Sequence, residues 1–522
     1  MPVYFDQGVF IKEVSLRILF PLIASVFAAA PALAQRSIEF ARAAAPEDAL
    51  IVAVDDAENL SALGRVIGDE ALADLRRAIS AQGFAAENGA TASVVSGAER
   101  FGEIHLVAVK KGEEMRARDW EDFGGRAGVL AKASKTAQIS IIAPGATTED
   151  VAEAAFGAAI GQYSFDTYKS DAEPVTGVLN FIAGEPGAAR ERFEGEGRHL
   201  ADAVMWVRDM QSEPGNVLYP EEFVRRARAA FQGVQNVSIT VLDVRQMERL
   251  GMGALLGVGQ GSERPSRLMV ARYNGGPAGG QPIVFAGKGV TFDTGGISLK
   301  PNNGMWMMKS DMTGAAAVMG ATLSLAKSGA PVNVVAIAGL VENMPGAGAQ
   351  RPGDVVKTMS GKTVEIMSTD AEGRLVLADA VWYAQEEYNP SLLVDVATLT
   401  GSVIRALSDE YAGLFTRDDA IAKRMKAAGE AAGEDLWRLP LHPNHDKQIE
   451  SVIADIKNAD TGNPGASTGA AFIGSFIKEE TPWAHLDIAG VDWREEALPT
   501  VPLGASGFSV RLLDQLAREG VQ

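Results

Sequence analysis

The sequence predicts a two-domain α/β protein, with a smaller N-terminal α/β domain and a larger C-terminal α/β domain built on a central mixed, mostly parallel sheet. Three observations lead to this class. The chain has 522 residues, 47% of them hydrophobic, which is ample material for two cores. Short β-runs alternate with helix-periodic segments. A turn cluster at residues 212–216, Ser-Glu-Pro-Gly-Asn, separates the two halves.

The first half contains β-runs and helix-periodic segments in alternation. The expected domain covers residues 35–187 and is followed by a helical linker at 188–210. No paired acid, nucleophile or phosphate loop stands out in it, so no chemistry is assigned to this domain. The expected strands are 49–54, 103–109 and 138–143, and the expected helices are 60–82, 119–136 and 148–168.

The second domain, residues 211–522, repeats the α/β pattern and carries most of the unusual charges. These charges lie where strands give way to loops, the end of an open α/β sheet at which ligands bind. The expected strands are 238–242, 267–273, 282–286, 332–338, 392–397 and 485–489, with helices at 313–327 and 374–387.

Composition limits the classes of function. The net charge of −19 argues against nonspecific nucleic-acid binding, which needs a basic surface. The acidic balance mainly keeps such a chain soluble. The chain has no cysteine, which excludes disulfides, thiolate zinc sites and a thiol nucleophile.

The N-terminus predicts export. Residues 18–30 form an uncharged apolar run after Arg17, and Pro-Ala-Leu-Ala at 31–34 supplies a cleavage signature. The run is shorter than the ~20 apolar residues of a membrane span, so no stable span is expected in the mature chain. We expect a signal peptide at 1–34, cleavage after Ala34 and a periplasmic protein. The alternative, an N-terminal core helix, fits Pro21 and Pro31 poorly.

The most informative segment is residues 368–374, Ser-Thr-Asp-Ala-Glu-Gly-Arg, which precedes an apolar-periodic run. Further acids and amines lie upstream at short spacing. So many charges beside Gly-rich apolar segments would be costly to bury without compensation, and a pair of divalent metal ions would supply it. The hard oxygen donors are Asp293, Asp311, Asp370 and Glu372, of which Asp293 and Glu372 are the best bridging candidates.

The neighbouring cations need roles of their own. Lys288 is expected in a Gly-Lys-Gly turn directly after a strand. It can bind metal only as the neutral amine, which two dications and burial would favour. Lys300 can reach over the site and stabilise a developing oxyanion. Arg374 opens a helix, where it can hold a small oxyanion such as bicarbonate that serves as general base.

Ordinary structural roles compete with this interpretation. Asp370 could be a helix N-cap, Glu372 a first-turn acid, and Arg374 its partner in a surface ion pair. The five histidines form no HExxH pair, and His485 is expected to be a hydrogen-bonded core residue. These roles do not explain why four acids, three bases and many glycines gather in two short blocks.

The blocks resemble those of the leucyl (cytosol) aminopeptidases, peptidase family M17. Residues 368–375 are similar to the family's Asn-Thr-Asp-Ala-Glu-Gly-Arg-Leu signature, with Ser368 in place of Asn. Residues 287–301 resemble its first metal block, and 308–312 with 314–317 its second. The resemblance covers roughly 211–522 and includes 395–401 and 485–490. In the first half, 161–169 is similar to a family stretch, and a macro-like α/β domain is implied there.

The resemblance implies a role for each matching residue. One metal would be held by Asp293, Asp370 and Glu372, and a second by Lys288, Asp293, Asp311 and Glu372. Lys300 matches the catalytic lysine and Arg374 the bicarbonate-binding arginine. Substrate-binding positions are implied at Met308, Thr398 and Gly401, although these could equally be ordinary core. The family also implies Mn or Zn, with Mg as a third candidate, and a homohexamer.

The expected function is therefore release of N-terminal amino acids, with leucine-like residues preferred, from peptides. Ser368, Ser310 and Thr313 depart from the usual family residues but remove no ligand. The signal peptide is the larger departure, because most relatives are cytoplasmic, and that location is the alternative. The rival functions are a two-metal phosphatase-type hydrolase, a noncatalytic DNA-binding role and a scaffold.

Overall fold

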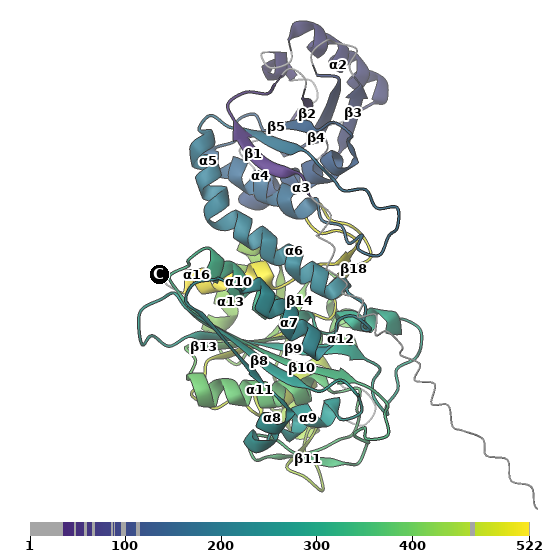
Figure 1. Cartoon of the computed structure of the whole chain (residues 1–522), viewed down its shortest axis with the longest axis vertical. Coiled ribbons are helices and arrows are strands. Elements are labelled where there is room, and N and C mark those ends of the chain that lie inside the picture. Colours follow the sequence, from purple (N-terminus) through teal and green to yellow (C-terminus); the bar gives the residue numbers. More distant parts are fainter. Residues whose placement is uncertain are drawn as a thin grey trace, which may run out of the picture.

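The computed structural model describes residues 35–520 except for 46–47, 57–59, 65–67, 85–86, 88, 96–100, 111–114 and 460–464. Figure 1 shows a smaller N-terminal domain above a larger C-terminal one, each with its own sheet. The fold is the two-domain α/β class that the sequence predicts. The expected signal peptide lies outside the described residues. Among those that are described, every helix is too short or too polar to cross a bilayer.

The N-terminal sheet has six strands in the order β1-β6-β5-β2-β4-β3, and only its edge strand β3 is antiparallel. All side chains of β2 are buried, as expected for a central strand covered on both faces. The strands are β1 (Ser37–Ala41), β2 (Ala49–Val54), β3 (Thr91–Val95), β4 (Glu103–Ala108), β5 (Gln138–Ile142) and β6 (Val178–Ile182).

The helices of this domain include a tightly packed pair, α3 (Ala117–Ala133) and α4 (Thr148–Gly161). A Cβ at Gly124 would lie 1.8 Å from the carbonyl oxygen of Ala154, so only glycine permits this approach. Within the expected helix at 60–82, the structure describes a 3₁₀ turn η1 (Leu60–Leu63) and α2 (Asp69–Gln82), which follows Gly68 at φ 87°, while residues 65–67 lie outside the described residues. The predicted helix at 148–168 ends at Gly161.

A helical connector lies between the two sheets. It comprises α5 (Pro186–Arg192), a π-helical turn η3 (Phe193–Gly197) and α6 (Arg198–Ser212). In Figure 1, α6 runs between the two sheets. Its buried Arg208 donates to the carbonyl oxygens of Ile160 at 2.8 Å, Thr500 at 2.7 Å and Ser506 at 3.0 Å, which ties both domains to α6. The exact domain limits, 35–187, 188–210 and 211–522, stay a prediction.

The C-terminal sheet has eight strands in the order β15-β14-β17-β13-β9-β10-β8-β7. Its centre, β17-β13-β9-β10, is parallel, and β14, β8 and β7 add antiparallel pairings. The strands are β7 (Val237–Leu242), β8 (Arg267–Asn274), β9 (Ile283–Asp293), β10 (Asn333–Asn343), β13 (Leu392–Ala397), β14 (Ala412–Phe415), β15 (Leu436–Arg438) and β17 (Trp483–Asp487).

Helices cover both faces of this sheet. One core lies under α6, α10 (Thr313–Lys327), α13 (Asp419–Ala432) and α16 (Val510–Glu519), and the other under α9 (Gly253–Gly259), α11 (Gly373–Tyr388) and α15 (Ala466–Gly474). The remaining elements are α7 (Pro220–Ala230), α8 (Val244–Leu250), η4 (Met305–Ser310), α12 (Gly401–Leu407), α14 (Pro443–Gln448), β11 (Val355–Lys357), β12 (Thr363–Glu365), β16 (Ile456–Lys457), β18 (Trp493–Arg494) and β19 (Gly504–Ala505).

One predicted element is wrong in a way that matters for the site. Strand β9 does not end at Ala286 but continues to Asp293, so Lys288 lies inside a strand and not in a turn. The flanking glycines serve close packing: a Cβ on Gly287 would lie 2.4 Å from the carbonyl oxygen of Gly314 in α10. The Gly-Lys-Gly segment at 287–289 therefore has the sequence of a turn but forms part of a central strand.

Candidate metal centre

The cluster of charges lies at the carboxyl edge of the parallel strands. Asp293 is the last residue of β9 and pairs in register with Asn343 at the end of β10. Val396 in β13 pairs with Gly287, which brings the loop after β13 beside Lys288. Acids on separated segments thus meet at one edge because neighbouring parallel strands end together.

Asp293 is fixed by several donors. Its Oδ1 accepts hydrogen bonds from the backbone N–H of Gly295 at 2.8 Å and from Nδ2 of Asn343 at 2.7 Å. Its Oδ2 lies 2.9 Å from Nζ of Lys300. Gly295 has φ 85°, a left-handed conformation that favours glycine and turns the chain back toward the carboxylate.

Lys288 forms the centre of a second group. Its Nζ donates to Asp311 Oδ1 and to the carbonyl oxygen of Thr398, both at 2.7 Å, and lies 2.9 Å from Glu372 Oε1. The side chain is buried, and a Cβ on Gly373 would lie 2.6 Å from its Cδ, so glycine is needed there for space. Thr398 Oγ1 also donates to Asp311 Oδ1 at 2.7 Å.

The signature segment meets these groups at the start of α11. Oxygens of Asp293, Asp370 and Glu372 lie within 4.8 Å of one another. Asp370 Oδ1 is 2.5 Å from Nζ of Lys300. Asp370 is exposed and does not cap α11, whose N-cap is Glu372 without a side-chain capping bond. The alternative interpretation, in which Asp370 is a helix N-cap, is therefore wrong.

Burial and repulsion between neighbouring carboxylates raise the pKa of three of the four acids. Burial raises the pKa of Asp293 to about 6, helped by Glu372 and opposed by Lys300 and Lys288. Burial also raises the pKa of Asp311 well above its usual range, and it raises that of Asp370.

The other charged groups are held ionised by their neighbours. Burial acts to raise the pKa of Glu372, but Lys288 and Lys300 lower it. Burial acts to lower the pKa of both lysines, yet the surrounding carboxylates raise it, with Asp311 the strongest for Lys288 and Asp293 the strongest for Lys300. Without metal ions, the carboxylates thus favour a protonated Lys288, and binding of cations to the same carboxylates would reverse this.

The donor set fits divalent metal ions. Four carboxylates face only two ammonium groups, so negative charge is in excess in a largely buried region. Asp311 Oδ2 is buried and has no hydrogen-bond partner among the described residues. Hard, anionic oxygen donors with an unused lone pair are what such cations prefer.

Arg374 lies in the first turn of α11 and is only 2% exposed, so the surface ion pair suggested as an alternative is wrong. Its Nη1 donates to the carbonyl oxygen of Asn458 at 2.7 Å, while its Nε is buried and finds no partner in the described part of the chain. A Cβ on Gly469 would lie 3.2 Å from Nη2, so glycine leaves room beside the guanidinium. These features fit a small bound oxyanion.

The three expected substrate-binding positions lie in different settings. Thr398 is buried and engaged with Asp311, whereas Met308 in η4 is partly buried and Gly401 is exposed at the start of α12. His485 is a buried core residue whose Nδ1 lies 2.5 Å from Asp395 Oδ1, as the sequence predicts.

Two site residues were missed by sequence reasoning. Asn343 donates to Asp293 and to the carbonyl oxygen of Thr369 at 3.0 Å, so it links two of the acidic segments. Asn458 donates to the carbonyl oxygens of Ser368 and Ala371. Asn343 could have been found as a polar residue ending a β-run, like Asp293; Asn458 has no such signal.

The chain belongs to the cytosol aminopeptidase family. The model of the family's catalytic domain matches residues 205–514, and that of its N-terminal domain matches 51–172. A "Probable cytosol aminopeptidase" of Xanthobacter autotrophicus is 43% identical over 92% of this chain and 98% of its own length. A "Probable cytosol aminopeptidase" of Caulobacter vibrioides is 44% identical over 91% of this chain and 97% of its own length. The chain is therefore a metalloaminopeptidase.

Solved structures agree with this assignment. A mutant of tomato leucine aminopeptidase superposes with a TM-score of 0.82 at 29% identity, covering 94% of this chain and 98% of its own. The bottromycin maturation enzyme BotP in complex with Mn superposes with a TM-score of 0.80 at 32% identity, covering 91% of this chain and 100% of its own.

Replacing one carboxylate tests the metal centre. The Asp293→Asn variant keeps an oxygen to accept the bonds from Gly295 and Asn343, but it loses a charge and places an amide N–H₂ toward Lys300. We expect it to fold and to bind Mn²⁺ or Zn²⁺ at least about tenfold more weakly. Metal analysis after dialysis measures this. Asp354→Asn, at an exposed ion pair with Arg351, is the control; equal metal content in both variants would contradict the assignment.

Proposed function

We propose that the protein is a two-metal leucyl aminopeptidase, which releases N-terminal amino acids, leucine-like ones preferred, from peptides. The observation that carries this proposal is the meeting of Asp293, Asp370 and Glu372 with two lysines at the carboxyl edge of the sheet. Membership of the family supports the reaction class, and the tomato relative's name supports the preference for leucine.

The residues divide into two overlapping metal sites. Asp293, Asp370 and Glu372 would hold one ion, and Lys288, Asp293, Asp311 and Glu372 the other. When bound, a pair of divalent ions activates water as a nucleophile and polarises the peptide carbonyl. Mn or Zn is proposed, with Mg as a further candidate; the similarity to BotP, whose solved complex contains Mn, supports Mn.

Lys300 is the proposed catalytic cation. Its carboxylate neighbours raise its pKa, so its ammonium is fully protonated at neutral pH. Because the side chain is 22% exposed, it lies at the border between the cluster and solvent, where a substrate carbonyl can approach. A fixed ammonium there stabilises negative charge that develops on the carbonyl oxygen in the transition state.

Arg374 is proposed to hold bicarbonate. Nε has no partner among the described residues, the glycine at 469 leaves space, and the start of α11 supplies N–H groups and a favourable dipole. An anion bound there can take and return the proton that moves from water to the leaving amine. Burial lowers the pKa of Arg374 to about 10, so the guanidinium remains charged at neutral pH.

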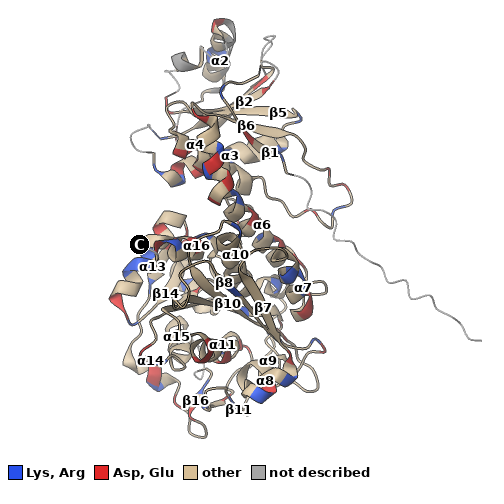
Figure 2. Cartoon of the chain, turned by 60° about the vertical axis from the view of Figure 1, so that its left-hand side comes forward, with Lys and Arg blue, Asp and Glu red and all other residues tan. Residues whose placement is uncertain are grey.

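Met308, Thr398 and Gly401 are proposed to contact the first side chain of the substrate. Their support is the resemblance, together with the contact of Thr398 with Asp311. A homohexamer is likewise a proposal from the family. In Figure 2, Lys and Arg are interspersed with Asp and Glu over both domains, which fits the expectation of no nucleic-acid partner.

The Lys300→Ala variant tests the proposed mechanism. We expect kcat for L-leucyl-p-nitroanilide to fall by about 10²–10³, the usual effect of losing one oxyanion donor, while the metal content stays unchanged. Lys357→Ala, at an exposed position, is the control. Turnover by Lys300→Ala equal to that of the control would contradict the role.

A substrate panel with the wild type separates the rivals. Faster hydrolysis of p-nitrophenyl phosphate than of the anilide would favour a phosphatase, and hydrolysis of neither would favour a DNA-binding or scaffold role.

Location is a separate prediction. The relatives carry the name cytosol aminopeptidase, which favours the cytoplasmic alternative, whereas residues 1–34 predict export to the periplasm. If export is correct, the protein recovered from a periplasmic fraction will begin at Gln35, as read by N-terminal sequencing. Recovery of the uncleaved chain from the cytoplasm alone would show that the signal-peptide interpretation is wrong.

A further inference from the structure

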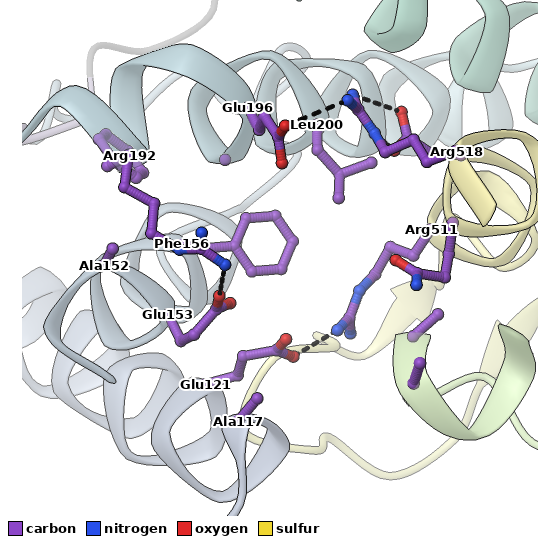
Figure 3. Close-up of a pocket in the computed structure, with 16 residues that line it drawn as sticks. Ala117, Glu121, Ala152, Glu153, Phe156, Arg192, Glu196, Leu200, Arg511 and Arg518 are labelled. Atoms are coloured by element: carbon purple, nitrogen blue, oxygen red, sulfur yellow. Dashed lines mark hydrogen bonds and ion pairs between the residues drawn. The ribbon is translucent and has the colours of Figure 1, made fainter. Parts of the chain in front are cut away.

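A cavity of about 240 Å³ lies between the two domains (Figure 3). Helices α3, α4, α5 and α6 with η3 line it from the N-terminal side, and α13 and α16 from the C-terminal side. None of its lining residues is one of the proposed metal, catalytic or substrate-binding residues. At ~30 Å³ per water, the volume corresponds to about eight waters, or one small amino acid.

Charged side chains of both signs line the cavity. Glu121 of α3 and Glu153 of α4 approach from one side, and Arg511 and Arg518 of α16 from the other (Figure 3). Arg511 Nη2 is bonded to Glu121, but its Nε is buried and has no partner among the described residues. A buried guanidinium with an unused donor is costly unless something else accepts from it.

The negative charges of Glu121 and Glu153 are only partly compensated by neighbouring cations. Burial raises the pKa of Glu121 to about 7, although Arg511 opposes this and Glu153 adds to it. Arg192 lies 3.6 Å from Glu153 but only 2.5 Å from Glu149, so its closer partner is outside the cavity. A ligand cation between the two acids would therefore be stabilised.

Part of the lining is apolar. The ring centroid of Phe156 lies 5.2 Å from the guanidinium carbon of Arg511, and Leu200 and Ala152 add further apolar surface to the lining. A ligand with one positive group, one negative group and an apolar part matches these features. Inorganic phosphate would meet four carboxylates, those of Glu121, Glu153, Glu196 and Asp514, and a bare metal cation would meet three guanidinium groups.

We propose that this cavity binds a free α-amino acid with an apolar side chain. Its carboxylate accepts from Nε of Arg511, and its ammonium donates to Glu121 and Glu153. Its side chain packs against Phe156 and Leu200. Because the walls belong to different domains, the bound amino acid links them and stabilises their arrangement.

The same ligand class is the product of the proposed peptidase reaction. Product released at the metal centre would thus also bind between the domains. This consequence rests on the proposed function, whereas binding in the cavity does not.

Isothermal titration of the full-length, metal-loaded protein with L-leucine tests the proposal. We expect binding to the wild type and to Asp293→Asn, whose substitution lies in the metal centre. Leu200→Trp, which fills the cavity, and the isosteric Glu153→Gln should each weaken binding at least tenfold. Glu149→Gln, on the same helix but outside the cavity, is the matched control and should bind like the wild type. Thermal unfolding confirms that each variant is folded.

Ligand analogues make the test independent of any one variant. N-acetyl-leucine lacks the ammonium, leucinamide lacks the carboxylate, and inorganic phosphate lacks both apolar part and cation; none should bind in the cavity. Leucine binding lost in Asp293→Asn but kept in Leu200→Trp and Glu153→Gln would overturn the proposal, as would no binding to the wild type. Cavity-dependent binding without hydrolysis of leucyl-p-nitroanilide would instead contradict only the proposed function.

Discussion

The C-terminal domain is organised around a costly electrostatic arrangement: four carboxylates and two ammonium groups gathered at the carboxyl edge of its sheet. Burial alone opposes every one of these charges. They remain together because each lysine contacts two carboxylates and because Asn343 and Thr398 donate hydrogen bonds to Asp293 and Asp311, respectively. An excess of negative charge persists, and metal ions are the natural means of compensating it.

Close packing makes this arrangement geometrically possible. The N-terminal end of α10 lies against β9 at Gly287, which brings Asp311 beside Lys288. The start of α11 lies over the same lysine at Gly373, which brings Glu372 to it. A side chain at either glycine would separate the acids from the amine. Chemistry at the site therefore depends on backbone contacts that carry no charge themselves.

The sequence predicted much of this, for reasons that differ between residues. Asp370, Glu372 and Arg374 share one short segment, so their proximity is local, and β13 and α10 were predicted with their observed bounds. The sequence predicts a turn at Lys288 because two flanking glycines are a turn signal, whereas in the structure Lys288 lies inside β9 and Gly287 permits the close approach of α10. Asn458 joins the site only through folding, as do Glu121 and Arg511 in the interdomain cavity, so no local pattern reveals them.

We propose that the acids at this edge of the sheet bind two metal ions that share Asp293 and Glu372. Anomalous X-ray diffraction from crystals of the Mn-loaded protein tests it most directly. We expect two anomalous peaks about 3.5–4 Å apart, both within coordination distance of those two carboxylates. Peaks only elsewhere in the molecule, with Lys288 and Lys300 still ion-paired to the acids, would contradict it.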